Sequence, residues 1–348
     1  MWVTSSLATA LKPTAVALGN FDGVHLGHRQ VIRPILQATI ASGEVTNEPS
    51  VEDCQVPLER SSLSILKENF ENPLAQERGH VYPTVATFDP HPREFFSGVS
   101  WKMLTPRSEQ IQQLGILGVE QLVLLPFDRE LASLSPQQFV EKILVKHLGV
   151  KWVSVGEDFR FGHQRAGTSA DLKAIASSYG IDVTIVSLQT CQGERISSSV
   201  IRQALEQGNI TQANQRLGRP YNLTGLVVKG QQLGRTIGFP TANLELPPEK
   251  FLPRQGVYGV RVAAPSLSST ISSQPGVMNI GMRPTVSGTA LSVEIHLLDW
   301  SGDLYGQTLI VSLEQFLRPE QKFASLDNLK AQIQADCAVA RAFFENGK

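Results

Sequence analysis

The stretch Ala17-Leu-Gly-Asn-Phe-Asp-Gly-Val-His-Leu-Gly-His28 joins a predicted strand to a predicted helix. Residues 15–18 are apolar and predict a short buried strand, and the glycines that follow let the backbone turn tightly and approach a ligand. From Arg29 onward, apolar residues recur at the spacing of one helix face: Val31, Ile32, Ile35, Leu36 and Ile40. The first turn of that helix points its free N–H groups at the glycine turn, which predicts a phosphate site there.

Two histidines, His25 and His28, stand three positions apart beside this helix start. At that spacing both rings can face the same anion, and an imidazole donates a hydrogen bond in either protonation state. A lone histidine pair at a helix start is more often a solvated cap. Here the strand, the glycines and the histidines occur in register, which favours a binding site.

The string Gly-Asn-Phe-Asp-Gly-Val-His-x-Gly-His resembles the FAD synthetase branch of the nucleotidyltransferase superfamily, whose signature is His-x-Gly-His. The resemblance implies that His25 and His28 are catalytic. It also implies nucleotide or phosphate binding by Gly19, Asn20, Phe21, Asp22 and Gly27.

The rest of the first half alternates short apolar strands with amphipathic helices. Strands are predicted at 83–88, 122–125, 152–155 and 183–186, and helices at 107–117, 136–148 and 169–179. This alternation predicts a Rossmann-like α/β domain, a parallel sheet covered on both faces, with ligands beyond the carboxyl ends of its strands. The stretch 42–80 is rich in Glu, Asn, Ser and Pro and is predicted to be a surface insertion, partly disordered.

The segment Val155-Gly-Glu-Asp-Phe-Arg-Phe-Gly162 follows a predicted strand directly and resembles a loop of the same family. The resemblance implies that Asp158 binds the nucleotide ribose, because a carboxylate accepts hydrogen bonds from hydroxyls. A plain turn with two buried phenylalanines is the alternative. Phe161 is a candidate to stack on the flavin, although a core phenylalanine would look identical.

The segment Arg195-Ile-Ser-Ser-Ser-Val-Ile-Arg202 resembles the family motif Arg-x-x-Ser-Ser/Thr-x-x-Arg. Arg195 and Arg202 flank the serines at a predicted helix start, which suggests an anion clamp that includes Ser198 and Ser199. Serines in this place can also cap the helix without any ligand. Ser199 stands where many relatives carry Thr, and the hydroxyl is retained.

After Gly218-Arg-Pro220 the apolar pattern changes to a period of two. Strands are predicted at 221–229, 257–263, 277–280, 292–298 and 307–313, and a helix is predicted at 325–344. Such spacing is typical of a small antiparallel β-barrel, here followed by a C-terminal helix. We therefore predict two domains, 14–203 and 216–348.

The stretch 225–244, Gly-Leu-Val-Val-Lys-Gly-Gln-Gln-Leu-Gly-Arg-Thr-Ile-Gly-Phe-Pro-Thr-Ala-Asn-Leu, resembles the riboflavin kinase signature. Its glycines also suit hairpins and bulges, so the Pro-Thr-Ala-Asn string is the more specific part. The resemblance implies nucleotide binding by Gly230, Gly234, Gly238, Pro240, Thr241 and Asn243. Thr241 and Asn243 carry hard oxygens suited to Mg²⁺ shared with nucleotide phosphates.

Glu294, within Val293-Glu-Ile-His296, is implied to be the catalytic base of this kinase. A carboxylate is the right group to take a proton from an alcohol that attacks a γ-phosphate. An isolated strand glutamate is more often a surface carboxylate paired with a cation. Gly256-Val-Tyr-Gly259 and Asn279-Ile-Gly281 match the same family in the same order and favour the catalytic role.

Together these motifs resemble the bacterial bifunctional riboflavin kinase/FAD synthetase family over about residues 14–344. The resemblance implies that riboflavin and ATP give FMN in the barrel, with Mg²⁺, and that FMN and a second ATP give FAD and pyrophosphate in the first domain. Flavins are then substrates and products. Two alternatives are a nucleotidyltransferase for another phosphorylated precursor, such as phosphopantetheine, and a flavin-binding regulator whose catalytic residues have decayed.

Composition bounds the remaining possibilities. The 348 residues carry a net charge of -1, without the basic excess of a general nucleic-acid binder. Three distant cysteines form neither a metal-ligand spacing nor a disulfide framework. No apolar run approaches the roughly 18 residues of a membrane span, and the N-terminus lacks a basic region before an apolar run. We expect a cytoplasmic monomer or weak homo-oligomer without nucleic-acid or membrane partners.

Overall fold

The computed structural model describes residues 1–40, 80–230, 233–267, 271–285 and 288–346. Contacts between Cα atoms divide the chain into two compact units, and the chain passes from one to the other between Ser198 and Ser199. The domain limits 14–203 and 216–348 stay a prediction. The predicted insertion at 42–80 lies outside the described residues, apart from His80.

In the described part of the first unit, six parallel strands form one sheet in the order β1-β4-β3-β2-β5-β8. They are β1 (Trp2–Thr4), β2 (Thr14–Leu18), β3 (Tyr82–Asp89), β4 (Gln121–Pro126), β5 (Val150–Gly156) and β8 (Asp182–Val186). Every residue of β2 is buried, as expected for a central strand covered on both faces. The predicted parallel sheet is confirmed, and the edge strand β1 is an addition that the sequence did not indicate.

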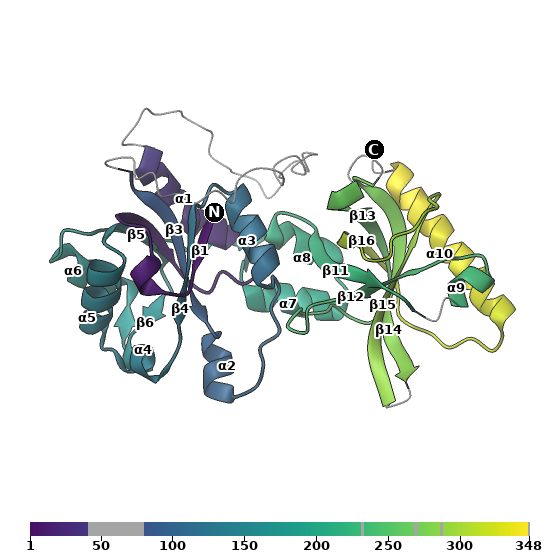
Figure 1. Ribbon diagram of the computed structural model, residues 1–348, viewed down its shortest axis with the longest axis horizontal. Helices are drawn as coiled ribbons and strands as arrows, with labels where there is room; N and C mark the ends of the chain where they lie inside the picture. The colour runs from purple at the N-terminus through teal and green to yellow at the C-terminus, as the bar shows by residue number, and fades with distance from the viewer. Residues whose placement is uncertain (41–79, 231–232, 268–270, 286–287, 347–348) are drawn as a thin grey trace. The chain divides into compact units, whose positions relative to one another are not determined.

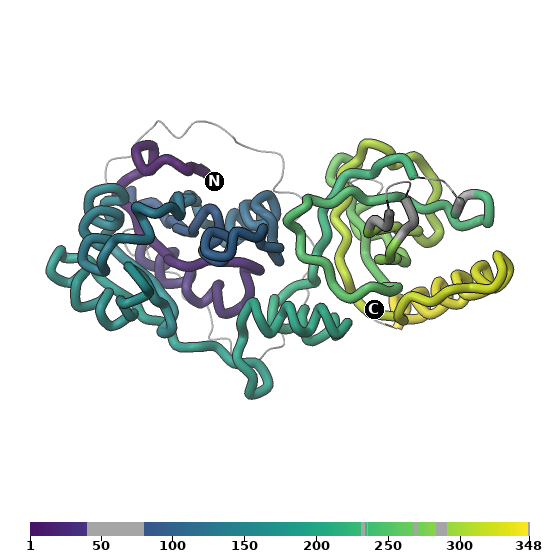
Figure 2. Tube along the Cα trace, turned by 90° about the horizontal axis from the view of Figure 1, so that it is seen from below, coloured from purple at the N-terminus to yellow at the C-terminus, as the bar shows by residue number. Residues whose placement is uncertain are grey.

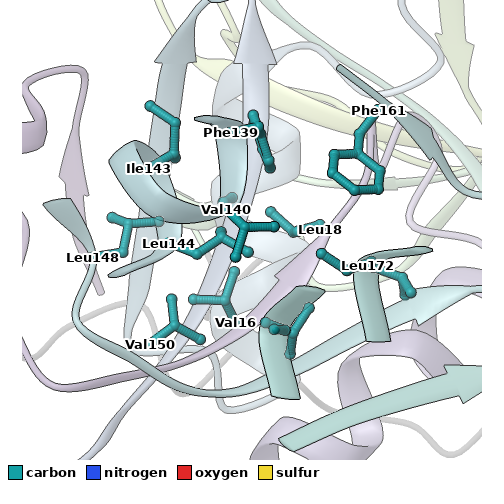
Figure 3. Close-up of a cluster of buried hydrophobic side chains, with 14 of the residues drawn as sticks. Val16, Leu18, Phe139, Val140, Ile143, Leu144, Leu148, Val150, Phe161 and Leu172 are labelled. Carbon is teal, nitrogen blue, oxygen red and sulfur yellow. The ribbon is translucent and has the colours of Figure 1, made fainter. Parts of the chain in front are cut away.

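Helices cover both faces of this sheet (Figure 1). The helices described in this unit are α1 (Leu26–Ile40), α2 (Pro92–Ser97), α3 (Arg107–Ile116), α4 (Arg129–Ser133), α5 (Pro136–Phe139), the π-helix η3 (Val140–His147) and α6 (Ser169–Ser177), with short 3-10 turns at η1 (Leu7–Thr9) and η4 (His163–Arg165). Side chains of α5, η3 and α6 pack with Val16 and Leu18 of β2 in one core (Figure 3). Those of α1 and α3 pack with Ala15 and Ala17 in another. Alternate residues of β2 thus serve opposite faces.

Two small two-stranded sheets accompany the main sheet. They are formed by β6 (Arg160–Phe161) with β7 (Gly167–Thr168), and by β9 (Thr190–Cys191) with β10 (Glu194–Arg195).

The described residues of the second unit form a closed antiparallel barrel of six strands in the order β11-β12-β15-β14-β13-β16. They are β11 (Tyr221–Val228), β12 (Ala242–Glu245), β13 (Gly256–Ala263), β14 (Gln274–Thr285), β15 (Gly288–Leu297) and β16 (Thr308–Arg318). Alternate residues of β11 are buried, which is the period of two expected of a strand with one face toward the interior. The predicted barrel is confirmed.

Helices α7 (Ser198–Gln207) and α8 (Ile210–Leu217) precede the barrel, and α9 (Leu233–Thr236) and η5 (Pro265–Leu267) connect its strands. The predicted C-terminal helix is α10 (Leu326–Asn346), which packs against β13, β14 and β16 (yellow in Figure 2). Its buried residues Cys337, Ala340 and Phe344 join a core cluster with Val257 of β13.

Candidate active sites

The first candidate site is the turn between β2 and α1. Strand β2 lies between β3, which follows it in the chain, and β5, which is reached only after the chain has formed the other edge of the sheet. Open parallel sheets usually bind ligands in a crevice at such a reversal, so we expect a ligand crevice at the carboxyl ends of β2 and β5. Gly19 and Glu157 are the residues that directly follow those two strands.

Buried hydrogen bonds hold this turn in an unusual backbone conformation. Phe21 and Val24 have φ angles of 49° and 42°, and Gly23 has 93°. The Thr105 N–H donates to Asp22 Oδ1 at 3.2 Å, and the Gly23 N–H donates to Thr105 Oγ1 at 2.8 Å. Strain of this kind persists only where the surroundings over-determine it, and it concentrates at functional sites. Asp22, predicted to bind nucleotide, is buried and supports the turn.

The rings of His25 and His28 are stacked, with centroids 3.6 Å apart and planes inclined by 13°. The His28 N–H donates to His25 Nδ1 at 3.2 Å, which requires an unprotonated Nδ1 and leaves the donor proton of the neutral ring on Nε2. A Cβ atom on Gly27 would lie 3.2 Å from Nδ1 and Cε1 of that ring. Glycine at this position therefore lets the two rings stack.

His28 lies in the first turn of α1, because the helix begins at Leu26 rather than at the predicted Arg29. Its Nδ1 is buried, with no hydrogen-bond partner among the described residues. Burial, and then the charge of His25, hold the pKa of His28 well below its ordinary value. The His28 imidazole is thus neutral near pH 7, and a neutral imidazole keeps one N–H that can donate a hydrogen bond.

Asp158 and Arg195 form an ion pair with each other at the carboxyl end of β5. Both side chains are about half exposed, at 50% and 48%. A polar ligand in the crevice can therefore reach either group. The predicted clamp is only partly assembled within the first unit: Ser198 Oγ donates to Asp22 O at 2.8 Å.

Ser199 and Arg202 belong to the second unit. Ser199 is exposed, and the Arg202 guanidinium lies 4.7 Å from the ring centroid of Phe251.

An aromatic cluster lies at the carboxyl ends of β3 and β4, where the sequence indicated only a loop. Phe127 contacts Phe88, Phe95 and Phe96 edge to face, with centroids 5.3 to 5.7 Å apart. Phe96 is 72% exposed. Phe161, in contrast, is 4% exposed and belongs to the core. The cluster joins residues some thirty positions apart, so only the fold brings it together.

The second candidate site is a row of polar side chains across three barrel strands. Asn243 of β12 is paired in register with Glu294 of β15, which is paired in turn with Asn279 of β14. Their neighbours Val293 and Ile295 are buried inside the barrel, so the row faces outward. The Thr241 hydroxyl donates to Glu294 Oε2 at 3.5 Å.

The glycine-rich segment packs directly on this row. A Cβ atom on Gly230 would lie 2.5 Å from Cγ of Asn243, and one on Gly234 would collide with the Phe239 carbonyl. Gly238 has a φ angle of 89°. These positions require glycine for close approach or for a left-handed backbone. Pro240 directly precedes Thr241 and contributes its carbonyl to a bond with His296.

The oxygen donors of this row fit a magnesium ion bound together with nucleotide phosphates. Thr241 and Asn243 offer neutral hard oxygens beside the Glu294 carboxylate. Among the described residues, no group of three His, Cys, Asp or Glu side chains is placed to hold a metal alone. Mg²⁺ typically takes few protein ligands and completes its shell with phosphates and water, so the donor set is suitable.

Two hollows lie near these strands. A cavity of about 270 Å³ is lined by Pro240 and Thr241, by the loop 300–305 and by the inward-facing side chains of Ala242, Ile295 and Leu297. A broad groove of about 510 Å³ is lined by residues 252–255 together with Glu206, Pro319 and Glu320. A Cβ atom on Gly281, next to Asn279 on the same face, would collide with the Glu320 carboxylate, so the groove reaches the row from the β14 side.

Comparison with known proteins assigns each part of the chain. A family model described as riboflavin kinase matches residues 217–344, and one described as FAD synthetase matches residues 7–46 and 66–200. A bifunctional riboflavin kinase/FMN adenylyltransferase of Escherichia coli K12 is 41% identical, with 94% of this chain and 92% of that protein covered. Its counterpart in Bacillus subtilis is 33% identical, with 96% and 93% covered.

A solved chain from Streptococcus pneumoniae, described as a macrolide-efflux protein, has a TM-score of 0.78 and 28% identity, and 97% of this chain and 98% of that one are covered. In the present chain, none of the helices within the described ranges is both long and apolar enough to traverse a bilayer.

Proposed function

Since the chain belongs to the bifunctional riboflavin kinase/FMN adenylyltransferase family, we propose that the outer row of the barrel carries the kinase reaction and that the β2–α1 crevice carries the adenylyl transfer. The enzyme phosphorylates riboflavin with ATP to give FMN, and adenylylates FMN with ATP to give FAD and pyrophosphate. The observation that carries the assignment is the separate match of the two units to the two family models.

In the barrel, Glu294 is the base that takes the proton of the ribityl 5′-hydroxyl as that oxygen attacks the γ-phosphorus of ATP. Two hollows in the same unit support this role. The cavity beside Thr241 is suited to the nucleoside of ATP. The groove beside Glu320 is suited to riboflavin. The reacting groups would then meet over the row of Asn243, Glu294 and Asn279.

Thr241 Oγ1 and Asn243 Oδ1 are the protein oxygens that would hold Mg²⁺ at this site. When bound there, the ion supplies charge neutralisation for the phosphates. The glycines at 230, 234 and 238 let the main chain approach the same phosphates, and their N–H groups are suited to cradle anions.

In the first unit, the FMN phosphate attacks the α-phosphorus of ATP and pyrophosphate leaves. A phosphate is already nucleophilic at pH 7, so the site's task is to position the reactants and to stabilise charge. The Nε2–H group of His25, the imidazole of His28 and the start of α1 are suited to this task. Arg195 joins them when the nucleotide takes the place of Asp158 as its partner, and Asp158 is then available to the ribose hydroxyls.

The exposed aromatic cluster supports a place for the flavin ring of FMN. Phe96 presents its ring to solvent at the carboxyl edge of the sheet and is held from behind by Phe127. An isoalloxazine ring stacks well on such a surface. This assignment replaces Phe161, whose burial leaves no room for a ligand.

Two variants separate the reactions. Glu294→Gln should abolish FMN formation from riboflavin but retain FAD formation from supplied FMN. His28→Ala should let FMN accumulate, because loss of one charge-stabilising donor costs about 10² to 10³ in rate. Flavins are separated by chromatography over time. Equal loss of both activities in Glu294→Gln, or undiminished FAD formation in His28→Ala, would refute the assignment.

Glu245→Gln is the matched control, because Glu245 is an exposed carboxylate of β12 whose partner in the β11–β12 ladder is Leu226. Both activities should be unchanged in this variant. A loss in Glu245→Gln as large as in Glu294→Gln would show that the substitution acts through barrel stability.

We also propose a reducing, cytoplasmic setting, which is supported by three cysteines spaced too far apart in the sequence to suggest a disulfide framework. ATP, riboflavin, FMN and FAD are the ligands, with no nucleic-acid or membrane partner. A monomer or weak homo-oligomer remains our expectation, to be checked by sedimentation.

A further inference from the structure

His296 lies two residues after Glu294 on β15 and shares its outward face. The reaction outlined above gives it no role. The histidine is partly buried, and its ring contacts the segment that leads into Thr241.

The contact is a hydrogen bond to the main chain. His296 Nδ1 lies 2.9 Å from the Pro240 carbonyl oxygen. A carbonyl only accepts, so Nδ1 carries the proton, and it does so both in this neutral tautomer and in the imidazolium. The ring also meets Phe239 edge to face, with centroids 5.5 Å apart and planes at 79°. The His296 side chain thus contacts two consecutive residues, Phe239 and Pro240.

The strand register explains why a side chain is needed at this place. The ladder between β12 and β15 consists of Ala242 with Ile295 and Asn243 with Glu294. Continued by one step, it would pair Thr241 with His296, but the ladder ends before that step and β12 begins at Ala242. Thr241 therefore stands just outside the ladder, and the imidazole holds the chain one residue earlier.

We propose that His296 is a positioning residue for the riboflavin kinase reaction. By donating Nδ1–H to the Pro240 carbonyl, it fixes the main chain before Thr241 and keeps the Thr241 hydroxyl at the Glu294 carboxylate, where the phosphates of ATP are handled. This inference rests on the assignment of the kinase to the barrel. The role proposed for His296 is geometric and requires no contact with substrate or with the reacting atoms.

The test compares three substitutions in the full-length enzyme. His296→Asn places an amide N–H near the former Nδ1 and should keep the bond. His296→Gln carries the same amide one methylene further, near the former Nε2, and should lose it. His296→Phe keeps the ring against Phe239 without a donor. A misplacement of about 1 Å costs about 10²-fold in rate, so kcat/KM for FMN formation should fall by that order in the Phe and Gln variants and by less than tenfold in Asn.

Hydrogen exchange supplies a readout that is independent of activity. The amides of Thr241 and Ala242 should exchange faster in His296→Phe and His296→Gln than in the wild type, and His296→Asn should restore slow exchange. FAD formation from supplied FMN should be unchanged in all three, which reports that the chain has folded. His163→Phe is a matched control, because His163 Nδ1 lies 3.2 Å from the Ala132 carbonyl in the first unit, and its kinase rate should equal that of the wild type.

The outcomes separate this inference from the proposed function. If Glu294→Gln lacks kinase activity while His296→Phe has wild-type rate and exchange, the positioning role is overturned and the kinase site stands. If His296→Asn is as impaired as His296→Phe although exchange is slow, the imidazole acts by another route and the positioning role is likewise overturned. If Glu294→Gln still makes FMN, the proposed kinase site itself fails.

Discussion

Gly230→Ala is expected to disable the kinase and to spare FAD synthesis. A Cβ atom at this position would lie 2.5 Å from Cγ and 2.6 Å from Oδ1 of Asn243. Ordinary contact begins near 3.4 Å, so the amide must retreat by about 0.9 Å, the difference between 3.4 and 2.5 Å. A positioning error of about 1 Å costs about 10²-fold in rate, and kcat for FMN formation should fall by that order.

The assay uses one preparation for both reactions. Initial rates of FMN formation from riboflavin are compared with initial rates of FAD formation from supplied FMN, at saturating ATP and Mg²⁺. Only the first rate should fall. Gly115→Ala is the control, because Gly115 lies within α3 and its Cβ atom would meet nothing within 4 Å. A kinase rate within twofold of wild type in Gly230→Ala would refute the collision.

A double-mutant cycle tests the route of the effect. Asn243→Ala should lower the kinase rate alone, and Gly230→Ala added to it should cost little more, because the side chain with which the new methyl group collides is already absent. Costs that add in full would mean that Gly230→Ala acts elsewhere, for example on phosphate contacts of its own main chain.

The remaining expectations concern the first unit. Phe96→Ala should raise KM for FMN by up to about tenfold, since one aromatic stack contributes about 0.5–1.5 kcal/mol; initial rates at varied FMN measure this, and an unchanged KM would remove Phe96 from the flavin site. Burial and the charge of His25 lower the pKa of His28 below 6.5, so the unfolded chain binds a proton there that the folded chain does not. Stability from this source is complete above about pH 6.5 and declines as the pH falls below it. Urea titrations of the full chain at about pH 7.5 and pH 5.5, read by exchange of first-unit peptides, should show a smaller loss in His28→Asn than in the wild type, and equal losses would contradict the shift.

The elements that the sequence predicts well are those with long, regular apolar patterns. The parallel sheet, the barrel and α10 all follow from such patterns, and the structure confirms them. Shorter elements were not predicted from the sequence. Strand β1 has three residues and pairs only with β4 at the edge, while α2 and α4 are single turns capped by His91 and Asp128. A local pattern of that length carries too little periodicity to be distinguished from a loop.

Strand β12 was not predicted, for a different reason. Its four residues overlap the Pro-Thr-Ala-Asn motif, which was interpreted as a binding loop. Buried Ala242 and Leu244 alternate there with Asn243. That alternation was the available signal, and it also indicates that Asn243 faces the same side of the barrel as Glu294.

Motif spacing does not predict what the candidate site residues contact. The sequence placed His25 and His28 on one anion site, and the structure adds that their rings are stacked and that His25 Nδ1 is an acceptor. Asp158 and Arg195 were assigned separate ligands, yet they pair with each other across 37 positions of chain. Contacts between segments this distant depend on the fold, and no local pattern contains them.

The alternation along β15 has a practical consequence for redesign. Glu294 and His296 point out of the barrel, whereas Val293, Ile295 and Leu297 are at most 5% exposed within it. Odd-numbered positions of this strand therefore pack inside the barrel, and the even-numbered positions 294 and 296 belong to its outer face. Ile295 and Leu297 also line the cavity beside Thr241, so of the three inward positions Val293 is the one whose side chain can be exchanged for stability apart from that cavity, whereas the outward set can be changed to seek a different phosphoryl acceptor.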